Sequence, residues 1–202
     1  MNPHFIFNSL NSIQQYVFAG DAVEANHFIT NFSSLVRQTL YISGKKFITL
    51  TEEIKYLESY LTLERIKYEN AFNFQIISNE ITRENILVPP LLLQPFIENS
   101  IRHGVLNLKK ECGKIFINFW VENNSLFCFL EDNGIGRENA RKLQNNKIND
   151  HRSKGMELVQ KRIENLNSIY NVNIAVSIED IIEKNKTGTR IKIQLPLNYD
   201  DY

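Results

Sequence analysis

Residues 114–139, KIFINFWVENNSLFCFLEDNGIGREN, decide the fold of this chain. KIFINFWVE and SLFCFLED are short runs rich in aromatic and other apolar residues, which favour β-strands. The Asn123-Asn124 pair between them is typical of a tight turn, so the two runs predict an antiparallel hairpin. Asn133-Gly134 then ends the second strand, because this dipeptide favours a turn.

Around this hairpin the chain alternates between predicted strands and predicted helices. Further strands are expected at 72–78, 173–180 and 188–196, and helices at 49–68, 88–104 and 155–170. Thr49 and Glu52 form a capping box at the start of the first helix, and the prolines of 88–104 are expected to initiate the second. From residue 46 to 202 the pattern predicts an α+β fold, an α/β sandwich with helices on one face of a mixed, mostly antiparallel sheet.

Residues 1–45 are predicted to form a separate helical hairpin. Apolar residues recur at helical spacing through 4–18, Gly20 ends that helix, and Asp21 caps a second one that runs to residue 42. The apolar stripe of this hairpin is wide, which predicts packing against a second copy in a four-helix bundle. The boundary to the following domain is expected at Ser43-Gly44-Lys45-Lys46.

Charge and composition exclude several classes of protein. Lys plus Arg and Asp plus Glu both number 23 in 202 residues, so the formal net charge is zero. A general nucleic-acid binder normally shows a basic excess, so no direct nucleic-acid binding is expected. No apolar run reaches the roughly 18 residues of a membrane span, so this chain is expected to make no membrane contact. Cys112 and Cys128 are interpreted as reduced core residues of a cytosolic protein.

Two segments carry polar residues of the kind that bind nucleotides. In EDNGIG, Asp132 ends a buried strand, and the turn that follows is either an ordinary Asn-Gly turn or part of a phosphate-binding loop. In IENSIRHG, Glu98 and Asn99 lie one helical turn from Arg102 and His103. Mg²⁺ prefers oxygen ligands, which an Asn carbonyl and a Glu can supply. The alternative is a solvent-facing polar strip on an amphipathic helix.

Two further segments supply glycines where a ligand could approach the backbone. Gly155 in SKGMELVQKRI is expected at a helix start, where free N–H groups and the helix dipole favour an anion. The polar residues 142–154 before it have the composition of a lid. Gly188 in TGTRIKIQLP lets a neighbouring backbone or a base come close to the strand.

In this order and spacing the four segments resemble the N, G1, G2 and G3 boxes of the GHKL ATPase superfamily. NPHFIFNSLNSI and PPLLLQPFIENSIRHG further resemble the LytS/YehU-type sensor histidine kinases of bacterial two-component systems. The resemblance extends from Asn2 to about Leu197. It implies a phosphoacceptor and dimerisation region at 1–45, followed by a GHKL (Bergerat) ATP-binding domain at 46–202.

The resemblance also implies roles for three residues in catalysis. His4 is expected to accept the phosphoryl group, and a neutral imidazole nitrogen is available as a nucleophile near neutral pH. Glu98 is expected to polarise the attack. Asn8, one turn from His4, is expected to orient a water that hydrolyses the phospho-aspartate of the partner.

For the cofactors, ATP and Mg²⁺, the resemblance implies a set of binding residues. Asn99 is expected to hold Mg²⁺ against the phosphates, and Asp132 to accept a hydrogen bond from the adenine amino group. The remaining expected nucleotide-binding residues are Arg102, His103, Asn133, Gly134, Gly136, Lys154, Gly155, Gly188 and Thr189. Such a site would transfer a phosphoryl group by positioning and charge neutralisation.

The chain departs from the family pattern in two places that bear on function. Ser153-Lys154-Gly155-Met156 stands where Gly-x-Gly-Leu is usual, so lid closure or phosphate contact is expected to differ. Phe5 follows His4 where commoner histidine kinases carry an acid, so the base that assists His4 stays unassigned, with Glu98 of the docked ATP-binding domain as one candidate.

By the same resemblance the partner is a response regulator, often with a LytTR-type DNA-binding domain, and the full-length protein is a homodimer. The acceptor helix is expected to extend upstream of Met1, so that this chain is the cytoplasmic part of a parent in the bacterial cytoplasmic membrane. Two alternatives stay open. The first is a catalytically weak ATP-binding module that signals by docking, and the second is a GHKL ATPase that moves a clamp.

Overall fold

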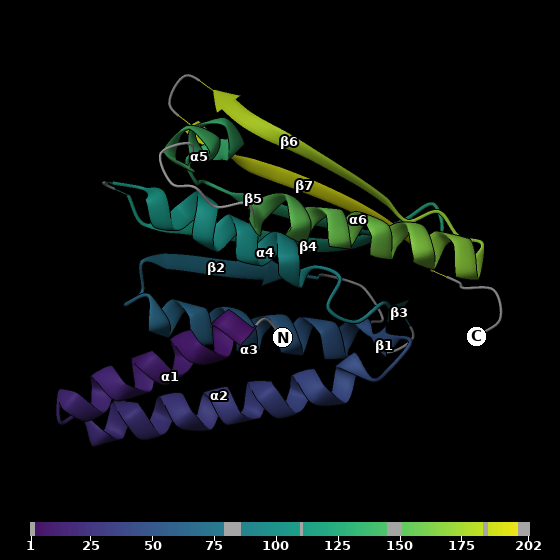
Figure 1. Ribbon diagram of the computed structural model, residues 1–202. Helices are drawn as coiled ribbons and strands as arrows, with labels where there is room; N and C mark the ends of the chain where they lie inside the picture. Colours follow the sequence, from purple (N-terminus) through teal and green to yellow (C-terminus); the bar gives the residue numbers. More distant parts are fainter. Residues whose placement is uncertain (1–2, 79–85, 110, 145–150, 184–185, 198–202) are drawn as a thin grey trace.

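The computed structural model describes residues 3–78, 86–109, 111–144, 151–183 and 186–197, with the side chains of residues 3–5, 144, 151–155 and 183 excepted. Two helices, α1 (Pro3–Phe18) and α2 (Ala22–Ser43), form the predicted hairpin at the N-terminus (Figure 1). The Asp21 side chain accepts the N–H of Glu24 and so caps α2 as expected. The hairpin packs through α2 against α3 (Leu50–Lys67), and its Phe28, Leu35 and Ile42 belong to the main core.

A five-stranded sheet forms the centre of the following domain. Its strands lie in the order β2 (Phe72–Ile77), β4 (Gly113–Glu122), β5 (Ser125–Asp132), β7 (Lys186–Pro196) and β6 (Ala175–Glu183). β2 runs parallel to β4, whereas the three other pairs are antiparallel. The predicted mixed, mostly antiparallel sheet is therefore confirmed. A pair of two-residue strands, β1 (Ile48–Thr49) and β3 (Leu87–Val88), was not predicted.

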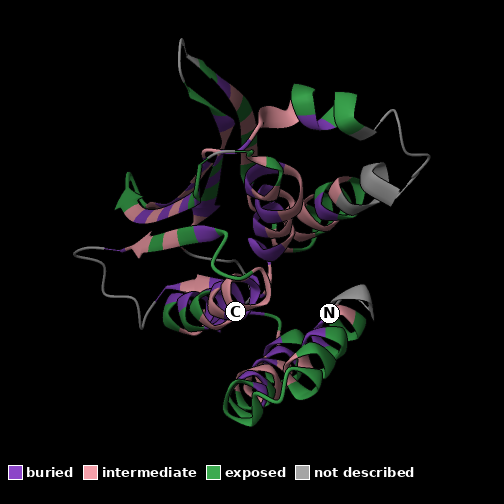
Figure 2. Cartoon of the chain, turned by 90° about the vertical axis from the view of Figure 1, so that its left-hand side faces the viewer, coloured by how far each residue is buried: buried purple, intermediate pink, exposed green. Residues whose placement is uncertain are grey.

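Helices cover one face of this sheet (Figure 2). α4 (Gln94–Asn99) continues into the π-helical turn η2 (Ser100–Gly104) and the 3₁₀ turn η3 (Val105–Asn107), and α6 (His151–Tyr170) lies beside it. Burial alternates along the strands, as a sheet covered on one face requires: Ile115, Ile117 and Phe119 of β4 are buried in the core. The capping box of α3 is confirmed, with both the Thr49 and the Glu52 bonds present.

Three predictions about local structure are wrong. The helix expected from the prolines of 88–104 begins only at Gln94, because Val88 pairs in β3 and Leu91 takes a positive φ of 59° that a helix cannot contain. α6 begins at His151 rather than at Gly155, and α5 (Gly136–Gln144) occupies part of the stretch expected to be turn and lid. Cys112 is exposed, whereas Cys128 is buried as expected.

Glu53 of α3 is a buried carboxyl under the turn that precedes α4. Its Oε2 accepts the backbone N–H of Leu91 at 3.1 Å, and Arg162 of α6 donates to the carbonyl oxygens of Pro90 and Leu91. Burial raises the pKa of Glu53 to about 7, against the opposing effects of these N–H bonds and of the Arg162 charge. The carboxyl thus helps to hold Leu91 in its unusual conformation.

The raised pKa of Glu53 predicts a loss of stability with increasing pH. Between pH 4.5 and about 7 the folded chain keeps a proton that the unfolded chain has lost, so the free energy of unfolding falls as pH rises through this window. The expected loss is on the order of 2–3 kcal/mol. Urea unfolding at several pH values should show that the free energy of unfolding falls less with rising pH in Glu53→Gln than in wild type. Glu58→Gln, at an exposed position on the same helix, serves as control and should follow wild type. If the free energy of unfolding of Glu53→Gln falls with pH as steeply as that of wild type, the raised pKa of Glu53 is contradicted.

Candidate nucleotide-binding site

A cavity of about 840 Å³ opens between the sheet and its helices. Its floor comes from the inward faces of β5, β7 and β6, and its walls come from α4, η2, α5 and α6. Described residues with polar side chains around it are Asn99, Ser100, His103, Asp132, Arg137, Arg141, Gln160, Glu164, Asn167 and Thr189. The apolar lining is Phe96, Ala140, Met156, Val159, Ile163, Ile174, Val176, Ile178 and Ile191. An apolar pocket with a few placed polar groups is the usual form of a small-molecule site.

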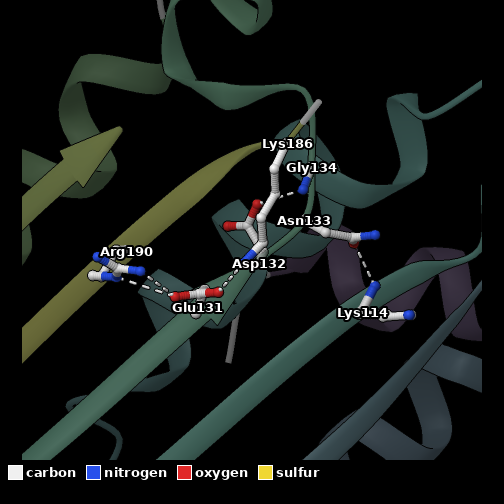
Figure 3. Close-up of polar contacts among 7 residues, drawn as sticks. All are labelled: Lys114, Glu131, Asp132, Asn133, Gly134, Lys186 and Arg190. Atoms are coloured by element: carbon white, nitrogen blue, oxygen red, sulfur yellow. Dashed lines mark hydrogen bonds and ion pairs between the residues drawn. The ribbon is translucent and has the colours of Figure 1, made fainter. Parts of the chain in front are cut away.

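Asp132 is the most buried acid of this cavity, with 1% of its surface exposed. Its Oδ2 accepts the hydroxyl of Ser100 at 2.8 Å. Its Oδ1 accepts the N–H of Gly134 at 2.9 Å, a bond shown in Figure 3. Burial raises the pKa of Asp132, while the bonds from Ser100, Gly134 and the Thr189 N–H act against the rise. A carboxylate offers about four acceptor positions. The three bonds therefore leave acceptor capacity for a ligand N–H.

The neighbour of Asp132 on β5 points to the other face of the sheet, as the period of two along a strand requires. Glu131 forms ion pairs with Lys186 at 3.1 Å and Arg190 at 2.8 Å, away from the cavity (Figure 3). These bonds lower the pKa of Glu131, although its partial burial acts in the opposite direction. The two adjacent acids thus have different surroundings, and only Asp132 lines the cavity.

Two glycines let the backbone around Asp132 pack closely. A Cβ on Gly134 would lie 2.4 Å from the Cα of Gly104 on η2, and a Cβ on Gly188 would lie 1.9 Å from the carbonyl oxygen of Asp132. Both distances are far inside van der Waals contact. Gly134 and Gly188 are thus required by contacts within the protein, and neither lines the cavity. The turn after β5 and the start of β7 are held against η2 by this packing.

The side chain of Asn133 also forms hydrogen bonds within the protein and does not line the cavity. Its Oδ1 accepts the N–H of Lys114 at 2.6 Å and its Nδ2 donates to the carbonyl of Cys112, so its side chain is directed towards β4 (Figure 3). Gly136 and Thr189, by contrast, line the cavity. Of the residues predicted at the end of β5, in the turn that follows it and in β7, Asp132, Gly136 and Thr189 meet at the cavity, whereas Asn133 lies outside it.

The helix α4–η2 divides its predicted residues between two faces. Asn99 and His103 line the cavity, and the Asn99 amide contacts the sulfur of Met156 on α6 at 3.0 Å. Glu98 and Arg102 are not among the lining residues. Glu98 and Asn99 are about 100° apart around the helix, and of the two only Asn99 is turned to the cavity. Glu98 instead bonds Gln94, which is joined to α3.

Several predicted positions lie at the edge of what the structure describes. The side chains of His4 and Lys154 lie outside it, and their predicted roles stay predictions. Gly155 is the fifth residue of α6, where the backbone N–H belongs to the helix rather than to its four free N-terminal donors. Asn8 lies in α1, where its carbonyl accepts the hydroxyl of Ser12.

Sequence reasoning missed six polar residues among those described around this cavity: Ser100, Arg137 and Arg141, and Gln160, Glu164 and Asn167 of α6. Ser100 follows Glu98-Asn99 directly, and a hydroxyl on a largely apolar helix indicates a buried partner, here Asp132. Arg137 of α5 lines the cavity and pairs with Asp180 of β6 at 3.0 Å. Arg141, one turn further along α5, also lines it. The two arginines were missed because α5 was not predicted.

The cavity fits a nucleotide bound through its base and its phosphates. Asp132 is a buried acceptor in the lining, and Arg141 brings a positive charge to it, whereas the guanidinium of Arg137 is paired with Asp180. The described residues contain no cluster of three or more His, Cys, Asp and Glu suited to a metal ion. Mg²⁺ needs only one or two protein ligands when phosphates supply the others, and the Asn99 carbonyl suits that role. Among the helices described, none has the length and apolar content of a membrane span.

Comparisons with known proteins agree with one another. The family model described as Histidine kinase matches residues 1–72. The sensor histidine kinase BtsS of Escherichia coli (strain K12) is 29% identical over 97% of this chain and 32% of its own length. The sensor protein LytS of Oceanobacillus iheyensis is 33% identical over 68% of this chain. The sensor histidine kinase/phosphatase LytS of Staphylococcus aureus is 34% identical over 67% of this chain. Each match covers 23% of the length of the relative. The chain thus spans about a third or less of these relatives.

Solved structures of histidine kinases are also similar to this chain. The catalytic domain of histidine kinase ThkA has a TM-score of 0.48 and 17% identity, and it covers 76% of this chain and 97% of its own. The histidine kinase AdeS of Acinetobacter baumannii has a TM-score of 0.48 and 14% identity, with 96% and 98% covered.

Proposed function

The chain belongs to the LytS-type sensor histidine kinases, and on this basis we propose that it transfers the γ-phosphoryl group of ATP to His4 and then to an aspartate of a response regulator. The observation that carries the proposal is the buried Asp132, whose carboxylate is hydrogen-bonded in the lining of a cavity of about 840 Å³. A buried carboxylate that still has acceptor capacity suits the amino group of adenine.

The residues around the cavity divide the work of binding. In this proposal Asp132 and Thr189 would bind the base, Asn99 would provide an oxygen to Mg²⁺, and His103 and Arg141 would lie near the phosphates. All five residues line the cavity, as does Arg137, which is paired with Asp180. When bound, Mg²⁺ neutralises charge on the transferred group. Arg102, Lys154 and Gly155 were predicted to contact the phosphates as well. Arg102 lies outside the cavity lining, so its contribution would require movement of the helix or of the ligand.

In the transfer step, one imidazole nitrogen of His4 forms a bond to the γ-phosphorus, and the bond from that phosphorus to the bridging oxygen of ADP breaks. The imidazole proton passes to a base. We assign this role to Glu98, a half-buried carboxyl that directly precedes Asn99, the proposed Mg²⁺ ligand, and is held by Gln94. Asn8 would act in the reverse direction, on the phosphorylated regulator.

The hairpin supports the proposal of a homodimer. Apolar residues of α1 and α2 are exposed to an extent unusual for a monomer, including Phe18 at 87% and Val23 at 78%. A second copy would cover them and complete a four-helix bundle. The regulator would carry a LytTR-type DNA-binding domain, and the parent protein would sit in the cytoplasmic membrane with this part in the cytoplasm.

A phosphorylation assay with the regulator distinguishes a chain that transfers phosphoryl groups from one that signals only by docking. We expect the chain, given Mg²⁺ and γ-labelled ATP, to pass label to the receiver domain of its regulator, and we expect both His4→Gln and Asp132→Asn to abolish this. If the chain only docks, the regulator stays unlabelled with every variant. In cells, the activity of the regulator would then be unaffected by His4→Gln but would be lost in Asp132→Asn. That pattern would contradict the kinase proposal.

A further inference from the structure

Three polar side chains, the buried Tyr56 and Gln94 and the half-buried Glu98, form a chain of hydrogen bonds from α3 into α4. The Tyr56 hydroxyl donates to Oε1 of Gln94 at 2.9 Å, and Nε2 of Gln94 donates to Oε1 of Glu98 at 2.8 Å. Tyr56 is 1% exposed and Gln94 is 7% exposed. Neither residue lines the nucleotide cavity. The chain of bonds therefore belongs to the side of α4 on which Glu98 lies.

The direction of these bonds follows from the chemistry of the groups. An ionised carboxylate only accepts hydrogen bonds, so the NH₂ of Gln94 must face Glu98, and its carbonyl must face Tyr56. That carbonyl then needs a donor. Burial raises the pKa of Tyr56, so its hydroxyl keeps its proton at neutral pH and donates. The amide of Gln94 is thereby locked in one orientation.

The chain of bonds ends at Tyr56 on α3. The hydroxyl of Tyr56 donates to Gln94, and the hydroxyl of Thr39 on α2 donates to the carbonyl of Leu35 at 2.7 Å, so each hydroxyl proton is already used. Thr39 is buried in the contact between α2 and α3. Glu98 is thus linked, through Gln94 and Tyr56, to the helix on which the N-terminal hairpin packs.

We propose that Gln94 is a positioning residue for Glu98, whose carboxylate it holds on the side of α4 that is directed towards α3. The inference rests on the proposed function, in which Glu98 takes the proton of His4. A free glutamate side chain samples many rotamers, and fixing one of them before reaction lowers the entropy cost of the transfer step. Tyr56 supports Gln94 and does not act on the reactants itself.

The inference predicts a specific pattern of autophosphorylation rates. Gln94→Met keeps the volume of the side chain and removes both bonds. We expect it to lower the maximal rate about tenfold while the KM for ATP and the affinity for ATP change less than twofold, because Gln94 lies outside the cavity. In a Glu98→Gln background, the same change should have less than a twofold effect. Gln194→Met, which removes a side-chain bond to Ser125 on the far face of the sheet, should leave the rate unchanged.

A second variant tests whether the lowered rate of Gln94→Met is due to a loss of folding. Gln94→Met leaves the Tyr56 hydroxyl buried without an acceptor, so the Tyr56→Phe/Gln94→Met pair should recover stability, since removing both partners is nearly neutral. It should still show the lowered rate.

The outcomes are distinct. Equal effects of Gln94→Met in both backgrounds, or a wild-type rate, would overturn the positioning role alone. A wild-type rate in Glu98→Gln would remove the role of Glu98 and this inference with it. Absence of any label on the wild-type chain would overturn the proposed function first.

Discussion

Asp132→Asn is expected to lower the affinity for ATP by about a hundredfold, close to 3 kcal/mol, the upper range for a hydrogen bond to a charged group. The fold should persist, because the amide keeps the shape of the side chain. Its oxygen can accept the N–H of Gly134, and its NH₂ can donate to the Ser100 hydroxyl, which rotates to accept. What the variant loses is the acceptor capacity that the carboxylate keeps for adenine.

Calorimetric titration with ATP measures this loss, and the adjacent acid provides the control. Glu131→Gln changes the same functional group one residue away, on the face of β5 that bonds Arg190 and Lys186. Its affinity for ATP should stay within about twofold of wild type. Equal affinities of Asp132→Asn and wild type would show that the carboxylate does not bind the base.

The sheet was predictable because its signals are local. KIFINFWVE and SLFCFLED form β4 and β5 on either side of the predicted Asn-Asn turn, and Asn123 and Asn124 have the positive φ values that such a turn requires. The capping boxes of α2 and α3 were predictable for the same reason, since each depends on two residues three positions apart. No such signal marks the start of α4. There the sequence offers prolines that suit a helix start, while pairing of β3 and the contacts of Glu53 with Leu91 hold the chain in another conformation.

The candidate site was predictable in its residue types and less so in its geometry. Asn99, His103, Asp132, Gly136 and Thr189 meet around one cavity although they come from distant segments. The glycines were expected to approach the base. Gly134 and Gly188 instead approach protein backbone, a long-range contact that depends on how η2 and β5 pack. Helical geometry separates Glu98 and Asn99 by about 100°, but which of the two would face the cavity depends on tertiary packing.

His4→Gln is expected to abolish phosphorylation of the chain while leaving ATP binding intact. Glutamine has no ring nitrogen that can attack phosphorus, so the acceptor is lost completely rather than weakened. The nucleotide cavity is built from residues 96–191, so its affinity for ATP should be unchanged. Asn8→Ala, on the same helix, should still be phosphorylated, because the role proposed for Asn8 concerns the regulator.

The most direct measurement is therefore the uptake of γ-labelled phosphate from Mg-ATP by wild type, His4→Gln and Asp132→Asn, with the stability of the product tested in acid and in base. The predicted result is an acid-labile, base-stable label on the wild-type chain that is absent from both variants. A label that persists in His4→Gln, or an ATP-binding wild-type chain that takes up none, would contradict the assignment of His4 as the phosphoryl acceptor.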